Sequence, residues 1–192
     1  LVVGEPVPPP VVFPKAAAVV GRLRQIRPQE RPATLAYACD TFDAFAYPSA
    51  QRVFRGDTFT ATGKAPLRLH ASAGEYESIQ LVLVPKSKAD AVLQVAGTEL
   101  AGPAGATVAL ESVNDFIYVP TRTPSQYNAR FPVGEYPEAL LPVKQITVKP
   151  EGNHPLFITW RIPPEAKPGL YRGSVTLAQG TVRHEIPVEL KV

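Results

Sequence analysis

The chain has 192 residues, of which 45% are hydrophobic and 19% charged, and a net charge of +3, which together allow one globular domain with a real core. Its single cysteine, Cys39, excludes an intrachain disulfide framework, and its longest purely apolar run, residues 16–20, is too short for a membrane span or a signal-peptide core. The 22 prolines lie scattered between apolar runs and exclude a long helical protein.

The first 33 residues are predicted to form a proline-rich extended arm. Residues 1–14 combine prolines with valines, which favours polyproline conformation. Residues 15–26 contain features of a short helix, which Pro28 would end. A group of four arginines follows: Arg22, Arg24, Arg27 and Arg31. It could form an anionic-surface patch, but no aromatic platform accompanies it, so we interpret it as a solvated segment and expect no nucleic-acid partner.

Residues 34–192 are predicted to form the folded domain, organised around the stretch GEYESIQLVLVP at positions 74–85. This stretch alternates with a period of two, as a strand does. Its beginning is polar and its end is apolar on both faces, so it should run from a sheet rim into a covered centre. Pro85 cannot donate a backbone hydrogen bond and should end the strand.

Further short strands are expected on both sides of this stretch, separated by turn signals. The sequence predicts them at residues 34–38, 52–54, 67–70, 91–95, 99–100, 107–110, 112–119, 143–148, 156–162, 171–177 and 182–192. Residues 41–49 carry aromatics without a clear period and are predicted to be a loop over the core edge. Pro187 suggests an edge strand or a bulge in the last strand. Many short strands without intervening helices indicate an all-β, two-sheet antiparallel β-sandwich, immunoglobulin-like or jelly-roll-like.

A long segment without periodicity, residues 121–141, is predicted to be a loop that serves a function or covers an edge. Its aromatic residues lack the in-phase aliphatic neighbours that would place them in a core. If this domain touches a ligand or another domain, this loop is the expected place. The candidate contact residues are Tyr127, Arg130, Phe131, Glu135 and Tyr136.

No constellation of residues predicts a catalytic or metal site in this chain. Glu75 and Glu77 have a spacing that could suit a glycosidase pair, but a catalytic pair normally comes from different elements, so a structural role is favoured. The three histidines share no metal-ligand spacing, and His184 lies in an apolar stripe where a hydrogen-bonded core role is favoured. Cys39 is interpreted as a buried inert thiol. Trp160 is in phase with aliphatic residues and is assigned to the core.

Four stretches resemble the N-terminal β-sandwich domain of glycoside hydrolase family 123 and its relatives. They are PSAQRVFRGD (48–57), GEYESIQLVLVP (74–85), GEYPEALLP (134–142) and PLFITWRIPPEAKPGLYRGSVTL (155–177). The last is the most specific, because its proline–glycine turn and its Y-x-G strand fall in register with the family. Gly74, Glu138 and Trp160 depart from the family pattern.

This resemblance implies a noncatalytic accessory domain. In the family, the sandwich precedes a (β/α)-barrel that carries the Asp-Glu pair for substrate-assisted hydrolysis of N-acetylhexosaminides. A barrel needs about 200–250 residues of its own, so we expect this chain, which also lacks methionine, to be an excised domain or a fragment. The expected partner is the catalytic barrel, with carbohydrate as a second candidate.

The alternative is a free-standing module that binds carbohydrate or protein, which would present a row of exposed aromatics. A third and least favoured hypothesis is an independent enzyme that uses Glu75 and Glu77. No cofactor is expected in any of these cases. We further expect a secreted, periplasmic or cell-surface location.

Overall fold

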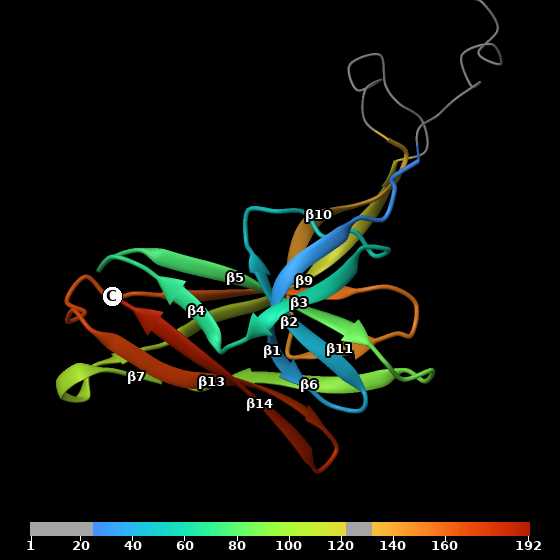
Figure 1. Cartoon of the computed structure of the whole chain (residues 1–192). Coiled ribbons are helices and arrows are strands. Elements are labelled where there is room, and N and C mark those ends of the chain that lie inside the picture. The colour runs from blue at the N-terminus through green and yellow to red at the C-terminus, as the bar shows by residue number, and fades with distance from the viewer. Residues whose placement is uncertain (1–24, 122–131) are drawn as a thin grey trace, which may run out of the picture.

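The computed structural model describes residues 25–121 and 132–192, and these residues form two packed β-sheets (Figure 1). The candidate residues Tyr127, Arg130 and Phe131, most of the N-terminal arm, Arg22 and Arg24 lie outside the described residues. The elements are β1 (Glu30–Ala38), β2 (Phe42–Pro48), β3 (Thr58–Lys64), β4 (Leu67–His70), β5 (Tyr76–Pro85), β6 (Ala91–Gly97), β7 (Leu100–Ala101), the 3-10 turn η3 (Pro103–Gly105), β8 (Thr107–Val108), β9 (Leu110–Thr121), β10 (Gly134–Pro142), β11 (Gln145–Val148), β12 (His154–Arg161), β13 (Leu170–Gln179) and β14 (Val182–Lys191).

The first sheet has the strand order β10-β9-β12-β5-β2-β1-β3, with β5 at its centre. Its neighbours pair antiparallel, except that β1 and β3 run parallel. The second sheet has the order β11-β6-β13-β14-β4; the short strand β7 also pairs with β13, and β8 pairs with β7. Here β14 and β4 are the parallel pair. The sandwich is therefore confirmed, but each of its sheets is mixed rather than purely antiparallel.

The core lies between the two sheets and is built from alternate residues of their strands. Ile79, Leu81 and Leu83 of β5 belong to it, as does Trp160 of β12, which is 1% exposed. The core assignment of Trp160 is confirmed. The second sheet contributes side chains such as Leu177 of β13. Burial of this apolar surface is the main force that holds the sheets together.

The outer face of the first sheet carries a second, smaller apolar cluster, which we call the outer cluster: Ala33, Phe45, Tyr47, Val53 and Val82, with Leu35, Phe59 and Val84 packed against it. Phe59 of β3 contacts the rings of Phe45 and Tyr47, with centroids 5.5 Å apart in both pairs. The end of β5 is thus buried on both faces, as its apolar character on both faces predicted.

Three sequence expectations about local structure are wrong. Residues 41–49 contain strand β2 rather than a loop. Phe42 faces the core while Phe45 and Tyr47 face the outer cluster, so apolar residues lie on both faces of the strand and its period of two is not visible in the sequence. Residues 52–54 are not a strand but part of the loop that covers the outer cluster. Strand β3 was not predicted; most of its side chains are exposed, so it shows no apolar alternation.

The predicted loop 121–141 also differs, because residues 134–142 form β10, which pairs with β9. The prolines of this segment favoured a loop over a strand. However, β10 is the edge strand of its sheet, and its pairing with β9 shifts register between Pro137 and Ala139. Proline is tolerated at such edges and bulges. In Figure 1, β9 and β10 extend beyond the body formed by the two sheets.

The ends of the first and last strands also depend on the tertiary structure. Strand β1 begins at Glu30, ahead of the expected domain start at residue 34. Before it, Gln25 forms an isolated parallel bridge with Val133, and the Ile26 N–H donates to the Val133 carbonyl at 3.0 Å. Strand β14 lies between β13 and β4 and pairs with β13 without a register shift, so the edge strand or bulge expected from Pro187 is not found. Pro187 is tolerated because β4 pairs with β14 only from Val188 onward.

Candidate functional site

The loop of residues 49–57, which we call the covering loop, connects β2 to β3 and joins several parts of the fold. Its buried centre is Asp57, whose carboxylate accepts hydrogen bonds from the Gln29 N–H at 2.9 Å and the Phe54 N–H at 3.1 Å. The Arg31 Nε donates to the same carboxylate at 3.1 Å, and the Asp57 side chain is fully buried. Arg31 is therefore not a solvated residue, as the sequence suggested, but the half-buried ion-pair partner of Asp57.

The covering loop is also fixed to the turn before β12. The side-chain amide of Asn153 donates to the carbonyls of Phe54 and Asp57. Gly152 has φ +83°, and a Cβ atom at this position would lie 2.7 Å from the Arg55 carbonyl oxygen. A side chain at this position would therefore clash with the Arg55 backbone. The loop can take this path only because residue 152 is a glycine.

A buried glutamine holds the first part of the covering loop against β5. The Nε2 of Gln80 donates to the Pro48 carbonyl at 2.7 Å and to the Gln51 carbonyl at 2.6 Å. Gln80 points to the outer face of the first sheet, where Val53 of the loop packs on the outer cluster. This polar residue in an otherwise apolar strand end therefore ties the backbone of the loop to β5.

Two arginines of the covering loop face the hairpin formed by β9 and β10. The Arg55 guanidinium lies 4.0 Å from the centroid of the Tyr118 ring and 3.8 Å from the Glu135 carboxylate. Arg52 lies over the Tyr136 ring at 5.8 Å and pairs with Glu138 at 3.5 Å. Phe54 packs edge-on against Tyr136, with ring centroids 5.6 Å apart.

Burial changes the pKa of three groups at this junction. Burial raises the pKa of Asp115 on β9, although the Phe116 backbone N–H and the nearby His154 and Arg55 oppose the shift. Burial also raises the pKa of Tyr118, whose hydroxyl donates to the Val53 carbonyl at 2.9 Å. Burial lowers the pKa of His154, whose Nε2 accepts a hydrogen bond from the Lys149 N–H at 2.9 Å.

Of the predicted contact residues, Glu135 and Tyr136 lie at this junction. Glu135 is exposed and paired with Arg55, whereas Tyr136 is buried and its hydroxyl donates to the Pro132 carbonyl at 2.7 Å. Tyr136 therefore packs against the loop. Sequence reasoning missed Asp57, Arg55 and Tyr118. The segment VFRGD, already part of the family resemblance, was the one signal that could have found the first two.

The other groups tested from the sequence have structural surroundings. His184 is buried and its Nδ1 lies 3.3 Å from the Tyr37 hydroxyl, as expected for a core histidine. Cys39 is half-buried rather than buried as expected, with its Sγ 3.4 Å from the Phe42 carbonyl. The Glu75 carboxylate accepts a hydrogen bond from the Ser72 N–H at 2.8 Å, which supports the structural role favoured for this residue. Within residues 25–121 and 132–192, no group of His, Cys, Asp and Glu side chains could hold a metal ion.

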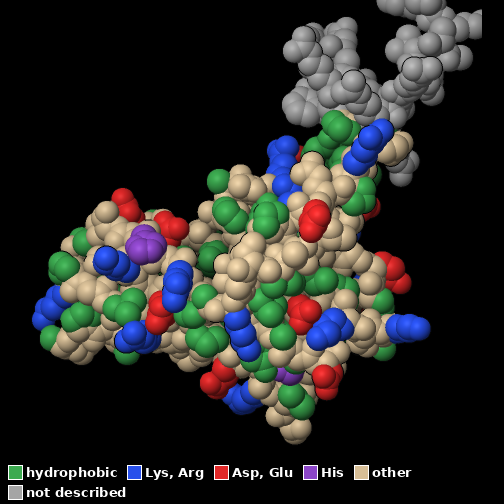
Figure 2. Space-filling view, viewed as in Figure 1, with side chains coloured by type: hydrophobic (Ala, Val, Ile, Leu, Met, Phe, Trp, Pro, Cys, Tyr) green, Lys and Arg blue, Asp and Glu red, His purple; other side chains and the backbone are tan. Residues whose placement is uncertain are grey.

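An exposed apolar surface occupies one face of the β9–β10 hairpin. Ile117 and Val119 alternate along β9, Ala139 lies opposite Ile117, and Leu141 lies opposite Asp115, so the four apolar residues share a face. All four are exposed, Leu141 by 51%. We call them the hairpin patch. Figure 2 shows hydrophobic side chains on this projecting part of the molecule and interleaved charges over the body.

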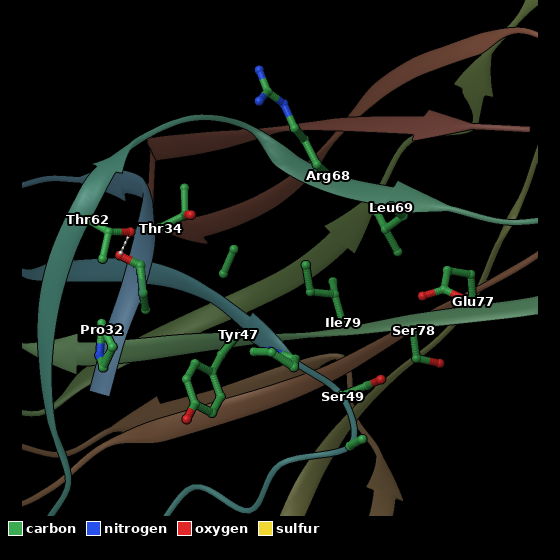
Figure 3. A pocket seen from close by; sticks show the side chains of 14 residues that line it. Pro32, Thr34, Tyr47, Ser49, Thr62, Arg68, Leu69, Glu77, Ser78 and Ile79 are labelled. Carbon is green, nitrogen blue, oxygen red and sulfur yellow. Dashed lines mark hydrogen bonds between the residues drawn. The ribbon is translucent and has the colours of Figure 1, made fainter. Parts of the chain in front are cut away.

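A cleft of about 460 Å³ opens between the two sheets at the end where β4 lies (Figure 3). Its walls come from β1, β2 and β5 of the first sheet, the start of the covering loop, and β3 and β4. Leu69 and Ile79 point into this space, and Glu77 lies at one end of it. Glu77 is half-buried, and no residue of the described chain forms a hydrogen bond or ion pair with its carboxylate.

The described residues thus define an all-β sandwich with a projecting hairpin. No helix in this part of the chain is long and apolar enough to pass through a membrane. No family model and no curated protein matches the sequence.

Among solved structures, the fold is similar to that of a family 123 glycoside hydrolase from Clostridium perfringens, studied for glycolipid glycan hydrolysis. The TM-score is 0.55 at 14% identity, and the match covers 65% of this chain and 22% of that chain. It shows a shared fold, and this chain corresponds to about a fifth of the hydrolase.

Two further structures match more distantly. They are the PapD-like domain 7 of human CEP192, with a TM-score of 0.35, 10% identity and coverage of 66% of this chain and 81% of that chain; and a chain of the CaDoc0917–CaCohA2 complex, with a TM-score of 0.34, 12% identity and coverage of 65% and 94%.

Proposed function

We propose that this chain is a noncatalytic accessory β-sandwich of a glycoside hydrolase that acts on N-acetylhexosaminides, and that it braces a catalytic barrel through the hairpin patch. The enzyme would be secreted, periplasmic or attached to the cell surface. The proposal extends the resemblance of the four sequence stretches, and the similarity of the fold to a family 123 glycoside hydrolase supports it.

The observation that carries this proposal is the hairpin patch. An accessory domain that packs on another domain should present apolar surface to it. Ile117, Val119 and Leu141 are each more than two-fifths exposed and lie together on a hairpin that extends beyond the sandwich. The covering loop contacts the other part of this hairpin through Arg52 and Arg55.

A free-standing carbohydrate-binding module is less well supported. Such a module would present a platform of several exposed aromatic rings. Among the large hydrophobic residues that are exposed in the described part of the chain, only Tyr76 is aromatic.

The test begins with the reading frame of the gene. The proposal expects the frame to continue beyond Val192 by a length sufficient for a barrel. Hydrogen exchange would then be compared between this chain and the full-length protein. We expect slower exchange of β9 and β10 in the full-length protein, because the catalytic barrel covers the hairpin patch.

Charge substitutions in the full-length protein locate the contact. Ile117→Lys should lower the thermal stability of the barrel or its hydrolytic activity, whereas Val182→Lys, at the 55% exposed start of β14, should leave both unchanged. A frame that ends at Val192, or equal exchange of the hairpin in both proteins, would overturn the proposal and leave the free-standing module.

A further inference from the structure

The second sheet ends at β4, and this strand has a free edge. Strand β4 pairs only with β14 among the described strands. The Ala71 N–H donates to the Lys191 carbonyl at 3.0 Å, which fixes the direction of the backbone groups along β4. Because these groups alternate in a strand, Leu67 and Leu69 direct theirs toward β14, and Arg68 and His70 direct theirs toward the free edge. The edge therefore offers two donors and two acceptors.

The cleft lies beside this edge, and Ala46, Leu69 and Ile79 give it an apolar floor. Ala46 of β2 and Thr34 of β1 pair with each other and line it, together with Leu69 and Ile79. The small side chains leave about 460 Å³ open. A space of this size accepts a few side chains but no folded domain. An added strand along β4 would place every second side chain into it, because the strand period is two.

Of the two charged side chains that line the cleft, only one has an ion-pair partner among the described residues. The Arg68 guanidinium points away from the cleft and pairs with Glu189 at 3.5 Å on the outer side of the second sheet. Glu77, at the end of the cleft, has no such partner within the described chain. Glu77 also lies opposite Trp160, whose buried Nε1 has no hydrogen-bond partner. The cleft thus combines a strand edge, an apolar floor and one uncompensated carboxylate.

We propose that this cleft binds an extended peptide of another protein, which adds a strand to the free edge of β4, fills the cleft with small apolar side chains and places one lysine or arginine on Glu77. Backbone hydrogen bonds to Arg68 and His70 supply sequence-independent affinity, as in other β-strand additions. The basic residue supplies selectivity. This peptide site is separate from the hairpin patch and does not depend on the proposed function.

The test uses the whole chain, labelled with ¹⁵N, and short synthetic peptides. The probe is acetyl-Val-Thr-Lys-Thr-Val-amide, in which both valines share a face with the lysine. The controls carry Glu in place of Lys or N-methyl groups on alternate amides. We expect the lysine peptide to shift the amide resonances of residues 67–70 and to bind about fivefold more tightly than the glutamate peptide, as for a partly exposed ion pair. The N-methylated peptide should bind at least as weakly as the glutamate peptide, because it cannot pair with the strand edge.

Two variants test the role of Glu77. Glu77→Gln should abolish the preference for lysine over glutamate, whereas Glu111→Gln, the same change at an exposed position of β9, should preserve it. If Glu77→Gln does not fold, the comparison of the lysine and glutamate peptides on the unmodified chain still tests the proposal. Equal binding of the lysine and glutamate peptides, shifts outside β4 and the cleft, or no shift at about 10 mM peptide would overturn the proposal. So would shifts at residues 67–70 with free monosaccharides and none with peptides.

Discussion

Single residues at the loop–hairpin junction have protonation states that depend on burial. His154 begins β12, and its Nε2 accepts the Lys149 N–H, which requires the ring to be neutral at that nitrogen. Burial is the main reason why the pKa of His154 lies below its ordinary value of 6.5; the contact with the Lys149 backbone opposes this shift, and the positive charge of Arg55 adds to it. The folded state therefore disfavours the charged ring.

This shift predicts how stability depends on pH. Below about pH 6.5, the unfolded chain binds a proton at His154 before the folded chain does, so the free energy of unfolding should fall as pH falls toward the folded pKa. His154→Gln should remove this part of the slope. Denaturant unfolding between pH 8 and pH 5 measures it, and an NMR titration should place the His154 midpoint below 6.5.

The control for this prediction is His70→Gln, which makes the same change at an exposed histidine of β4 and gives the slope with which that of His154→Gln is compared. Asp115 acts with the opposite sign, because its raised pKa makes the folded state bind a proton more readily as pH falls toward 3.8. Because the His154 charge lowers the pKa of Asp115, His154→Gln also changes the Asp115 contribution, and the NMR titration of His154 separates the two groups. A His154 midpoint at or above 6.5, or an unchanged slope in His154→Gln, would contradict the assignment.

At the scale of elements, the covering loop is held by one buried carboxylate. Asp57 joins the segment before β1 through Gln29, β1 itself through Arg31, and the loop through Phe54. Removing the carboxylate would take the acceptor away from the Gln29 and Phe54 N–H groups and break the ion pair with Arg31. The loop in turn supports the hairpin through Arg55 and Tyr136. Asp57 is therefore expected to control the order of both.

We predict that Asp57→Ala lowers the free energy of unfolding by about 3 kcal/mol, since breaking a buried pair leaves unsatisfied groups behind. Urea unfolding provides the value. The matched control is Asp43→Ala, which breaks a more exposed pair with Lys86 at 3.3 Å and should cost less than about 1 kcal/mol. Equal costs for the two variants would show that the Asp57 network does not hold the loop.

At the scale of the whole molecule, the first sheet is covered on both faces. The second sheet covers one face, and the covering loop covers part of the other through Val53 of the outer cluster. Val82 of β5 is fully buried in the outer cluster, although its neighbours Leu81 and Leu83 face the opposite side. A two-layer sandwich with a solvated outer face would leave Val82 exposed. The fold is therefore closer to three layers along the centre of this sheet.

The prediction that follows concerns Val82→Ala. It should destabilise the protein by about 2 kcal/mol, because it removes two methyl groups from a closed apolar cluster. The same substitution at Val92 of β6, which is 47% exposed, should change stability by less than about 0.5 kcal/mol. Thermal or denaturant unfolding of both variants measures the difference. A near-zero effect at Val82 would mean that the loop does not seal this face in solution.

The sequence predicted those elements whose side chains alternate between core and solvent. Leu67–His70, Tyr76–Pro85 and Val182–Lys191 follow such patterns, and the strands were found close to their observed bounds. The pattern is visible in the chain because a strand with one buried face must repeat with a period of two. The pattern disappears where both faces of a strand are buried, as in β2, and where most side chains are exposed, as in β3.

For the candidate site, the sequence pointed to Glu135 and Tyr136 but not to their partners. Arg52 and Arg55 lie about eighty residues earlier in the chain, and no local pattern links them to the hairpin. The same holds for Asn153 and Asp57, which only the sheet order brings together. Local periodicity carries no information about such distant contacts.

By itself, the sequence determined that this chain builds a β-sandwich, because periods of two and frequent turn residues leave the backbone few other ways to bury its apolar side chains. The tertiary structure alone decided which strands are neighbours, including the parallel pairs of β1 with β3 and β14 with β4. It also decided that Asp57 and Gln80 are buried, and that the hairpin patch and the β4 edge are open. These features depend on which surfaces remain uncovered after the sheets have packed, and that is a property of the assembled chain.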